Sequence, residues 1–225
     1  REPMLTAKLA STIDDLSGGR VILGCGVGWM PEEFKAVGSP PFEERGKVTD
    51  EYIDIFIELW TKENPKYRGQ YRSFEDLMFA PKPIQKPHLP IWIGGESIPA
   101  MRRVVRRGQA WFPSDANPKN PFNTAERFKG GINTLYKIAE DEGRSPESIH
   151  IGFWAISSPG VCENIILDNG SRKAFTGNVD DIVEDIKAYE EAGVESLLFN
   201  FLQDSCEATI DRMEEFAAEI MPKVH

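Results

Sequence analysis

Three glycines stand where a short apolar run ends, and their spacing suits ligand chemistry. The apolar run covers residues 21–23, and Gly24, Gly26 and Gly28 alternate with other residues after it. A glycine has no Cβ atom, so backbone that leaves a buried strand through glycines can come close to a ligand. The expected ligand is a phosphate group or a flat aromatic ring, and the plainer alternative is tight packing of the strand.

A second strand ends in glycine at residues 91–95. The apolar residues 91–93 run into Gly94 and Gly95, and Glu96 and Ser97 follow. A helix that begins after these glycines offers unpaired N–H groups and the positive end of its dipole to an anion. Ser97 can also cap that helix, because the same N–H groups serve a turn and a bound phosphate.

The main competing motif for the first segment is the dinucleotide fingerprint G-x-G-x-x-G. Counted from Gly24 and Gly26, its third glycine falls on Trp29 rather than on Gly28. The fingerprint also needs a second strand that ends in Asp or Glu about 20 residues further on. That region instead repeats apolar residues at helical spacing, and the Rossmann interpretation is therefore weak.

Composition excludes several classes of function. The 225 residues carry a formal net charge of −10, and this disfavours nucleic-acid and membrane-surface partners. The apolar runs are shorter than the ~20 residues that a membrane span requires. Cys25, Cys162 and Cys206 are widely spaced without a C-x-x-C pair. We therefore expect no metal site and no disulfide framework, and we predict a cytoplasmic protein.

Helices and strands are expected to alternate along the chain as one domain. Helices are expected over residues 5–16, 48–60, 100–107, 124–142, 179–192 and 208–223, with the first one amphipathic. Strands are expected over residues 21–26, 91–93, 110–112, 149–157 and 196–201, and a polar hairpin-like insert over residues 67–71. The alternation predicts a parallel sheet whose strands are neighbours in chain order. An open doubly wound sheet fits the count, but glycine endings after two different strands favour the carboxyl face of a (β/α)8 TIM barrel.

Short segments along the chain, the two glycine segments among them, occur in a characteristic order. They are residues 7–20, 24–34, 38, 45, 50–51, 59–61, 81–83, 90–97, 102–103, 108 and 111. This order resembles the bacterial luciferase-like monooxygenase family, and more narrowly its deazaflavin-dependent oxidoreductases. The resemblance implies a barrel of luciferase-like type in which residues 1–225 supply strands four to eight. It also implies that three βα units precede residue 1.

The resemblance places a cofactor phosphate at the carboxyl face of the barrel. Carried over residue by residue, the cofactor-binding set is Gly26, Val27, Gly28, Trp29, Arg45, Gly94, Gly95, Glu96 and Ser97. Without the resemblance, Arg45 reads as a solvated charge beside Glu43 and Glu44. Glu96 would repel a phosphate, so we expect its carboxylate to accept hydrogen bonds from the facing loop or to orient Arg45.

The resemblance also implies hydride transfer by coenzyme F420 to or from a small organic substrate, in a homodimer. One alternative is an FMNH2-dependent monooxygenase, with FMN as the cofactor. Another is a non-catalytic barrel remnant or a subunit that needs a partner. In the family the catalytic acid or base comes from strands that would precede residue 1, so no residue here is predicted to be catalytic.

Aromatic residues and histidines are expected to have mainly structural roles. We expect Trp92 in the core, and one of Trp111, Phe112 and Pro113 as a wall of the ring pocket. His88 and His150 lie at strand starts, which in a barrel is the face that supports stability. The sequence offers no Ser-His-Asp constellation, and none of the histidines is predicted to be catalytic.

Overall fold

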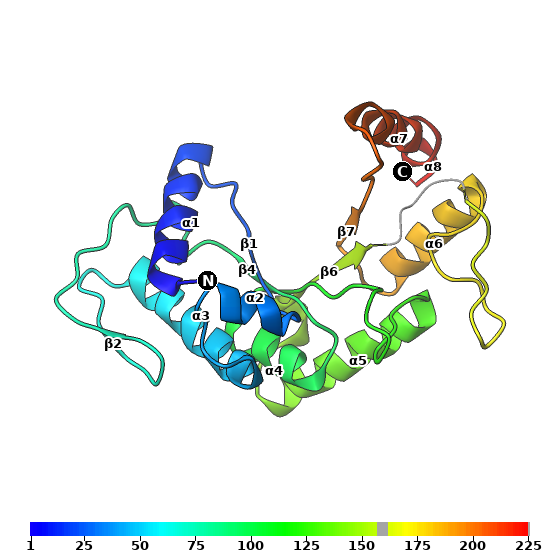
Figure 1. Ribbon diagram of the computed structural model, residues 1–225. Coiled ribbons are helices and arrows are strands. Elements are labelled where there is room, and N and C mark those ends of the chain that lie inside the picture. Colours follow the sequence, from blue (N-terminus) through cyan, green and yellow to red (C-terminus); the bar gives the residue numbers. More distant parts are fainter. Residues whose placement is uncertain (157–161, 225) are drawn as a thin grey trace. The chain divides into compact units, whose positions relative to one another are not determined.

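The computed structural model describes residues 1–156 and 162–224, and its chain forms two compact units. Unit 1 comprises Arg1–Gly94 and Arg106–Ala110, and unit 2 comprises Gly95–Val105 and Trp111–His225. Figure 1 labels the elements of both units along the chain, from blue at the N-terminus to red at the C-terminus. That the chain is one domain stays a prediction.

Five described strands form one sheet in the order β1-β4-β5-β6-β7. They are β1 (Leu23–Cys25), β4 (Ile91–Ile93), β5 (Ala110–Trp111), β6 (His150–Ala155) and β7 (Ser196–Phe199). The pairs β1–β4 and β6–β7 are parallel, with Leu23 opposite Ile91 and Gly152 opposite Ser196. The predicted strand neighbours are confirmed, and a parallel sheet with a helix after each strand is that of a partial (β/α)8 barrel.

Four of these strands are shorter than the sequence predicts. The apolar stretches at residues 21–26, 110–112, 149–157 and 196–201 continue past the last paired residue, and Ser157 itself lies outside the described residues. Apolar residues beyond a ladder still pack. Phe201, for example, lies outside β7 and places its ring 5.2 Å from that of Phe216. Hydrophobicity therefore marks burial more faithfully than it marks strand pairing.

In unit 1, helix α1 (Pro3–Ser17) packs on helix α3 (Arg45–Thr61) through small residues. Ala7 is fully buried, and its carbonyl accepts a 3.0 Å hydrogen bond from the Trp60 indole N–H. The large apolar residues of α1 are exposed instead, between 53% and 82%: Leu5, Leu9, Ile13 and Leu16. The predicted helix and its end at Gly18 are confirmed, and small residues, Ala7 and Ala10, allow the close approach to α3.

A carboxylate clamp fixes the predicted insert, which is a hairpin of β2 (Tyr67–Arg68) and β3 (Ser73–Phe74). The Glu51 side chain on α3 accepts hydrogen bonds from the amides of Gln70, Tyr71 and Arg72 at 2.7 to 3.1 Å. Gly69 makes this approach possible, because an added Cβ would lie 2.4 Å from the Glu51 carboxyl carbon. The hairpin is thus tied to the helix that precedes it.

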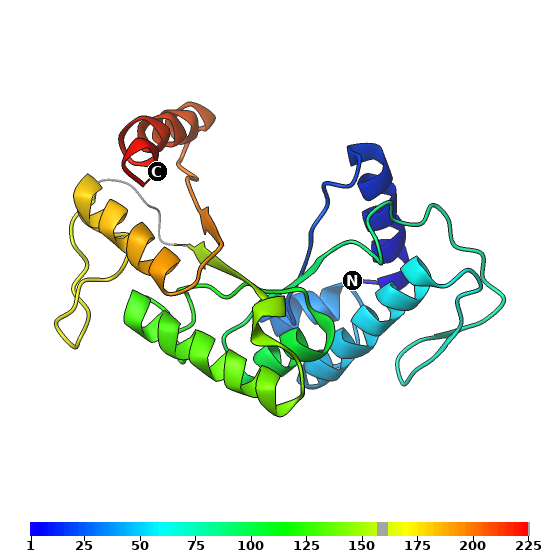
Figure 2. The same ribbon diagram turned by 180° about the vertical axis from the view of Figure 1, so that it is seen from behind.

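In unit 2, an aromatic core lies among β6, helix α5 (Ala125–Asp141) and helix α6 (Val179–Glu191). Phe128 stacks on Tyr189, with ring centroids 5.5 Å apart, and Phe153 lies 4.7 Å from Phe128. The buried Tyr189 hydroxyl donates to the Phe122 carbonyl, and burial raises the pKa of this tyrosine. Figure 2 shows α5 and α6 side by side, and the two helices are in contact.

The last predicted helix is divided into α7 (Cys206–Glu219) and α8 (Met221–Val224). Ile220 separates them, and Pro222 follows two residues later. Proline has no amide N–H and its ring crowds the carbonyl four residues earlier, so a continuous helix would be strained there. The break turns α8 toward α6, with which it is in contact.

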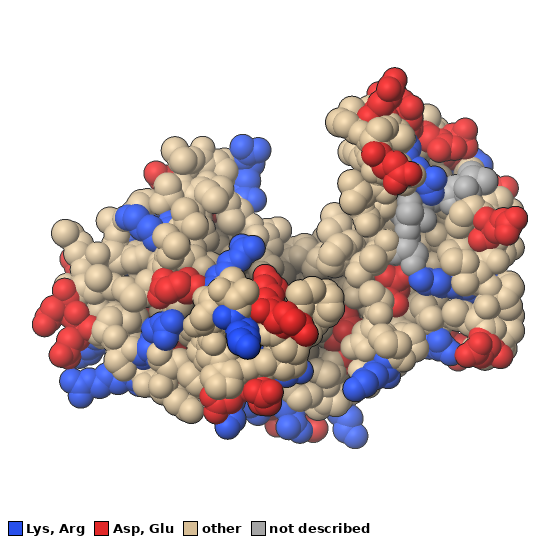
Figure 3. Space-filling model, viewed as in Figure 1, with Lys and Arg blue, Asp and Glu red and all other residues tan. Residues whose placement is uncertain are grey.

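The remaining shorter elements are α2 (Pro31–Ala36), the 3₁₀ turns Phe42–Glu44 and Pro146–Ser148, and α4 (Ile98–Arg107). Acidic side chains gather over α7 in Figure 3, where its sequence carries five carboxylates and one arginine. Within the described residues, every helix is too short or too polar to cross a membrane.

Candidate functional site

The first glycine segment belongs to unit 1 and is open on its surface. Among the described residues, a Cβ added at Gly24 or Gly26 would meet no other atom within 4 Å, so nothing there supports the tight-packing alternative for these two glycines. Gly28 differs, because its φ is +83° and an added Cβ would lie 2.6 Å from the Phe34 ring. Gly28 is therefore required by the local fold, whereas Gly24 and Gly26 leave backbone exposed.

The other two residues of this segment are accessible as well. Val27 is half-buried, and Trp29 is 80% exposed. A tryptophan with that exposure has surface available for stacking, but its role toward the cofactor stays a prediction.

Arg45, also in unit 1, begins α3 and is held by Phe42. Its Nη1 donates to the Phe42 carbonyl at 3.0 Å, and its guanidinium carbon lies 4.0 Å from the centre of the Phe42 ring. Among the described residues it forms no ion pair with Glu43 or Glu44. Within the described residues, the guanidinium is held by Phe42 and faces no carboxylate within hydrogen-bonding range, and its role toward a phosphate stays a prediction.

The second glycine segment crosses from unit 1 into unit 2. Gly94 donates its amide to the Cys25 carbonyl at 2.9 Å, which ties the ends of β4 and β1 together in unit 1. Gly95 follows with a φ of +105°, a backbone angle that favours glycine. Ser97 caps α4 as expected, because its hydroxyl oxygen accepts from the Ala100 amide at 3.4 Å.

The amides between Gly95 and Ala100 are the unusual feature of this segment. In the part of the chain that the structure describes, the N–H groups of residues 95 to 98 donate to no other group, and Pro99 has none to donate. Four successive free donors at a helix start, on a helix of ten residues, are a favourable setting for an anion.

Glu96 holds the loop that follows β5, within unit 2. Its Oε1 accepts from the Ser114 amide at 2.9 Å and from the Ser114 hydroxyl at 3.2 Å. Its Oε2 accepts from the Asn117 side-chain amide at 2.9 Å. The expectation that this carboxylate accepts hydrogen bonds from the facing loop is confirmed. With its oxygens engaged there, Glu96 works as a brace between two βα loops.

Trp111 is a third support of the same loop. Its side chain is fully buried, and its indole N–H donates to the Gly95 carbonyl at 2.9 Å. Trp111 is therefore core and cannot be the expected wall of a ring pocket, whereas Phe112 is only half-buried. Trp92 is half-buried too, and its place in the core stays a prediction.

The structure thus brings the predicted residues together in two groups. Unit 1 joins the end of β1 to Gly94, and unit 2 joins Gly95, Glu96 and Ser97 to the loop after β5. Sequence reasoning missed three supporting residues, Trp111, Ser114 and Asn117. The sequence signal that could have found them is their position just after a strand. Loops that follow neighbouring parallel strands lie at the same edge of the sheet, so their polar side chains face each other.

A second polar group in unit 2 lies at the amino ends of β6 and β7. The His150 Nε2 atom lies 2.8 Å from the Ser196 hydroxyl, and its Nδ1 atom lies 3.2 Å from Glu195 Oε2. Glu195 Oε1 also accepts from the Ile151 amide at 3.0 Å. The parallel pairing of two strand starts brings His150 and Ser196, which are 46 positions apart, together beside a glutamate. That none of the histidines is catalytic stays a prediction.

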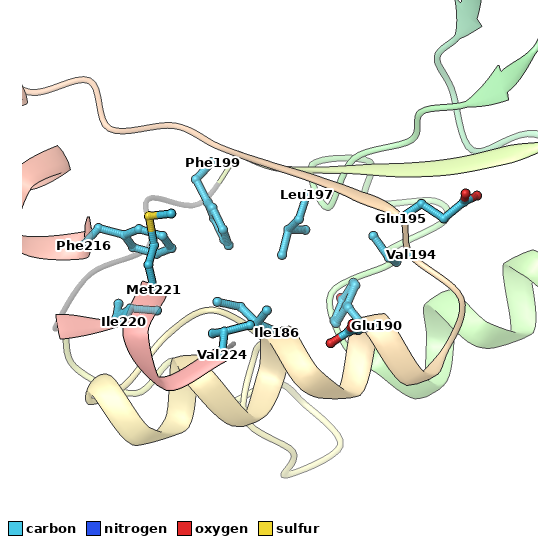
Figure 4. Close-up of a pocket in the computed structure, with 11 residues that line it drawn as sticks. Ile186, Glu190, Val194, Glu195, Leu197, Phe199, Phe216, Ile220, Met221 and Val224 are labelled. Carbon is cyan, nitrogen blue, oxygen red and sulfur yellow. The ribbon is translucent and has the colours of Figure 1, made fainter. Parts of the chain in front are cut away.

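A cavity of about 330 Å³ lies in unit 2 among α6, β7, α7 and α8. Apolar side chains point into it from these elements in Figure 4, while the Glu195 carboxylate turns away from it. None of the predicted cofactor residues lines this cavity. In the described residues, no three His, Cys, Asp or Glu side chains are grouped as a metal site.

Comparison with known proteins shows which family the chain belongs to. The profile of the luciferase-like monooxygenase family matches residues 1–159. An FMNH2-dependent dimethylsulfone monooxygenase from Pseudomonas putida is 27% identical over 265 residues, which cover 99% of this chain and 70% of that protein. A counterpart from Pseudomonas fluorescens is 27% identical over 268 residues, covering 99% of this chain and 70% of that protein.

Solved structures agree on the fold. An F420-dependent secondary alcohol dehydrogenase superposes with a TM-score of 0.75 at 16% identity, covering 100% of this chain and 76% of that one. The F420-dependent tetrahydromethanopterin reductase from Methanopyrus kandleri gives 0.76 at 15% identity, with coverages of 100% and 80%. Both likenesses place this chain in a barrel of the same type.

Proposed function

Because the chain belongs to the luciferase-like monooxygenase family, we propose that it binds a flavin-type cofactor by the cofactor's phosphate and acts as an oxidoreductase on a small organic substrate. The observation that carries this proposal is the run of free amides at residues 95 to 98. Backbone donors at a helix start bind phosphate without any nearby cation, which suits a chain of net charge −10.

The residues around these amides fit a phosphate. Glu96 is the one carboxylate of the segment, and its oxygens are occupied by Ser114 and Asn117. Gly95 has little room for a side chain, because an added Cβ would lie 3.2 Å from the Ala100 Cβ. The loop therefore keeps its donors accessible and its negative charge engaged. Within unit 1, Arg45 and residues 26–29 are proposed as cofactor contacts in their own right, with the guanidinium pairing two phosphate oxygens.

Coenzyme F420 is the cofactor we propose first, following the order of motifs along the whole chain. When bound, such a cofactor supplies the hydride chemistry, and the protein contributes binding, orientation and exclusion of water. FMNH2 is the second candidate, because the dimethylsulfone monooxygenases that resemble this chain use it. A cytoplasmic location and a homodimer stay predictions.

Spectroscopic titration of the purified protein tests the proposal. F420 and FMN are each added in turn, and the change in cofactor fluorescence gives a dissociation constant. Tighter binding of F420 supports the first candidate, and tighter binding of FMN supports the second. If neither cofactor binds at concentrations up to a millimolar, the oxidoreductase proposal fails and the interpretation as a non-catalytic barrel remnant replaces it.

A further inference from the structure

Trp111, the last residue of β5, is held firmly in the aromatic core of unit 2. Its side chain is fully buried, and its indole stacks on Phe128 with ring centroids 5.5 Å apart. The Phe122 ring meets the indole edge-on, also at 5.5 Å. Gly131 on α5 lies against it as well, because a Cβ added there would be 3.0 Å from Trp111 Cη2. These three neighbours fix the indole and with it the direction of its N–H group.

The indole N–H contacts the peptide unit that precedes Glu96. Indole Nε1 only donates hydrogen bonds, and here it donates to the Gly95 carbonyl at 2.9 Å. The peptide bond from Gly95 to Glu96 is trans, so its planar unit holds the Glu96 N–H opposite to the Gly95 C=O. Because Trp111 draws the carbonyl toward the core, the Glu96 N–H points away from the core.

The sequence of the loop alone does not fix the direction of this peptide. Gly95 has a φ of +105°, and a glycine allows more backbone directions than any other residue. Without the indole N–H, the Gly95 carbonyl would lose its partner in the core, and other orientations of the peptide would compete. The Trp111 donor therefore selects one orientation among those that Gly95 permits.

The side chain of Glu96 is held from the same end of β5. Ser114 and Asn117, which donate to the Glu96 carboxylate, follow Trp111 in the next few residues of the chain. Residue 96 is thus held twice, by the peptide before it and by its carboxylate. Its amide lies between these two contacts and donates to no other group among the described residues, so it is a free donor of fixed direction.

We propose that Trp111 is a positioning residue for the cofactor phosphate, an inference that rests on the proposed function of this loop. Its indole N–H directs the Glu96 amide, and with it the amides of residues 97 and 98, toward one phosphate group. Because Trp111 is fully buried, it touches neither the phosphate nor the flavin-type ring. Its effect is therefore confined to the phosphate end of the cofactor, and the ring binds independently of it.

Trp111→Phe tests the inference, because it keeps an aromatic ring in the core and removes the N–H donor. Fluorescence titration gives dissociation constants for FMN and for riboflavin, which lacks the phosphate. If the wild type binds F420 more tightly than FMN, the pair becomes F420 and its phosphate-free deazaflavin core. We expect the variant to bind the phosphate-bearing cofactor about 10-fold more weakly, as the loss of one charge-assisted hydrogen bond implies, and the phosphate-free one within about twofold of the wild type.

Tyr189→Phe is the matched control. The Tyr189 hydroxyl is also a buried donor to a backbone carbonyl in the same aromatic core, that of Phe122, at 2.9 Å. Thermal stability should therefore fall in both variants, while only Trp111→Phe should lose its preference for the phosphate. If Trp111→Phe does not fold, 3-benzothienylalanine at position 111 replaces it, because this analogue keeps the shape of the indole and has no N–H.

Three results would overturn the inference. If the wild type prefers the phosphate-bearing cofactor and the variant without the N–H keeps that preference, Trp111 does not position the loop, while the proposed function stands. An equal loss of preference in Tyr189→Phe would show a general loosening of the core. If the wild type itself has no preference, the proposed phosphate site fails and the inference fails with it.

Discussion

Glu51 in unit 1 and Glu96 in unit 2 both hold a loop through hydrogen bonds to a carboxylate, but they lie at different places in the order of strands and helices. Each carboxylate accepts several hydrogen bonds from a loop that lies far along the chain. Glu51 holds the hairpin that precedes β4, and Glu96 holds the loop that follows β5. At the turn tip held by Glu51, each backbone amide of residues 69 to 72 donates a hydrogen bond. Beside Glu96, in contrast, the amides of residues 95 to 98 donate to no other group among the described residues.

This difference separates a structural brace from a brace beside a binding site. Around Glu51 a ligand would have to displace existing hydrogen bonds. Around Glu96 the bonds that are formed fix the loop, and the donors that remain can serve an anion. The comparison predicts that changes at Glu51 act on folding, whereas changes near Glu96 act mainly on cofactor affinity.

The largest effect is expected for Glu51→Ala. Three backbone amides lose a charged acceptor, and this should lower the free energy of unfolding by about 3 kcal/mol. Urea denaturation gives the value, with Glu63→Ala as an exposed control that should change it by less than about 0.5 kcal/mol. A loss of cofactor affinity without a loss of stability would reverse the roles assigned to the two carboxylates.

Arg45→Ala should have the largest effect on cofactor binding. If the guanidinium pairs with the phosphate, its removal costs about 1.5 to 3 kcal/mol, which weakens binding roughly 10- to 150-fold. Folding should change little, because Arg45 makes one hydrogen bond and one ring contact. Arg68→Ala removes an equally charged but 87% exposed side chain and should bind the cofactor like the wild type. Equal affinities for the two variants would make Arg45 a surface charge.

Glu96→Gln tests the carboxylate that braces the loop in unit 2. Glutamine can still accept from Ser114, but its own amide group then faces that of Asn117 in place of an acceptor. The loop loses one support, and cofactor affinity should fall about 10-fold, with about 1 kcal/mol lost in stability. Titration and denaturation are measured on the same preparation, with Glu140→Gln as control. Tighter binding by the variant would show that the carboxylate acts on the phosphate by repulsion.

Ser97→Ala should have the smallest effect. A neutral donor whose place water partly takes contributes about 0.5 to 1.5 kcal/mol, so affinity should fall about 2- to 10-fold. The same change removes the cap of α4, and a small loss in thermal stability should accompany it. An effect larger than that of Arg45→Ala would mean that the serine, rather than the arginine, is the principal phosphate contact.

Much of the fold follows from periodicity and glycine placement. Strand order, the hairpin insert and the capping role of Ser97 agree with the sequence because each depends on local pattern. The contact between α1 and α3 could not be predicted, because it is made by small residues whose fit only the packed helices reveal.

The sites were predicted less completely than the fold. Glu96 was expected to accept from a facing loop, yet Trp111 and Asn117 depend on how two neighbouring loops meet. The contact of Ser196 with His150 depends on strand register, and a shift of one residue would turn one side chain to the other face. Sequence separation hides such contacts, and parallel pairing creates them.

The central claim is that free backbone amides after β4 hold the phosphate of a flavin-type cofactor. Affinity for FMN compared with riboflavin tests it most directly, because riboflavin keeps the ring and the ribityl chain but lacks the phosphate. We expect FMN to bind at least about 10-fold more tightly, as the loss of charge-assisted hydrogen bonds implies. If the protein binds riboflavin as tightly as FMN, the phosphate is not held by this loop and the account is contradicted.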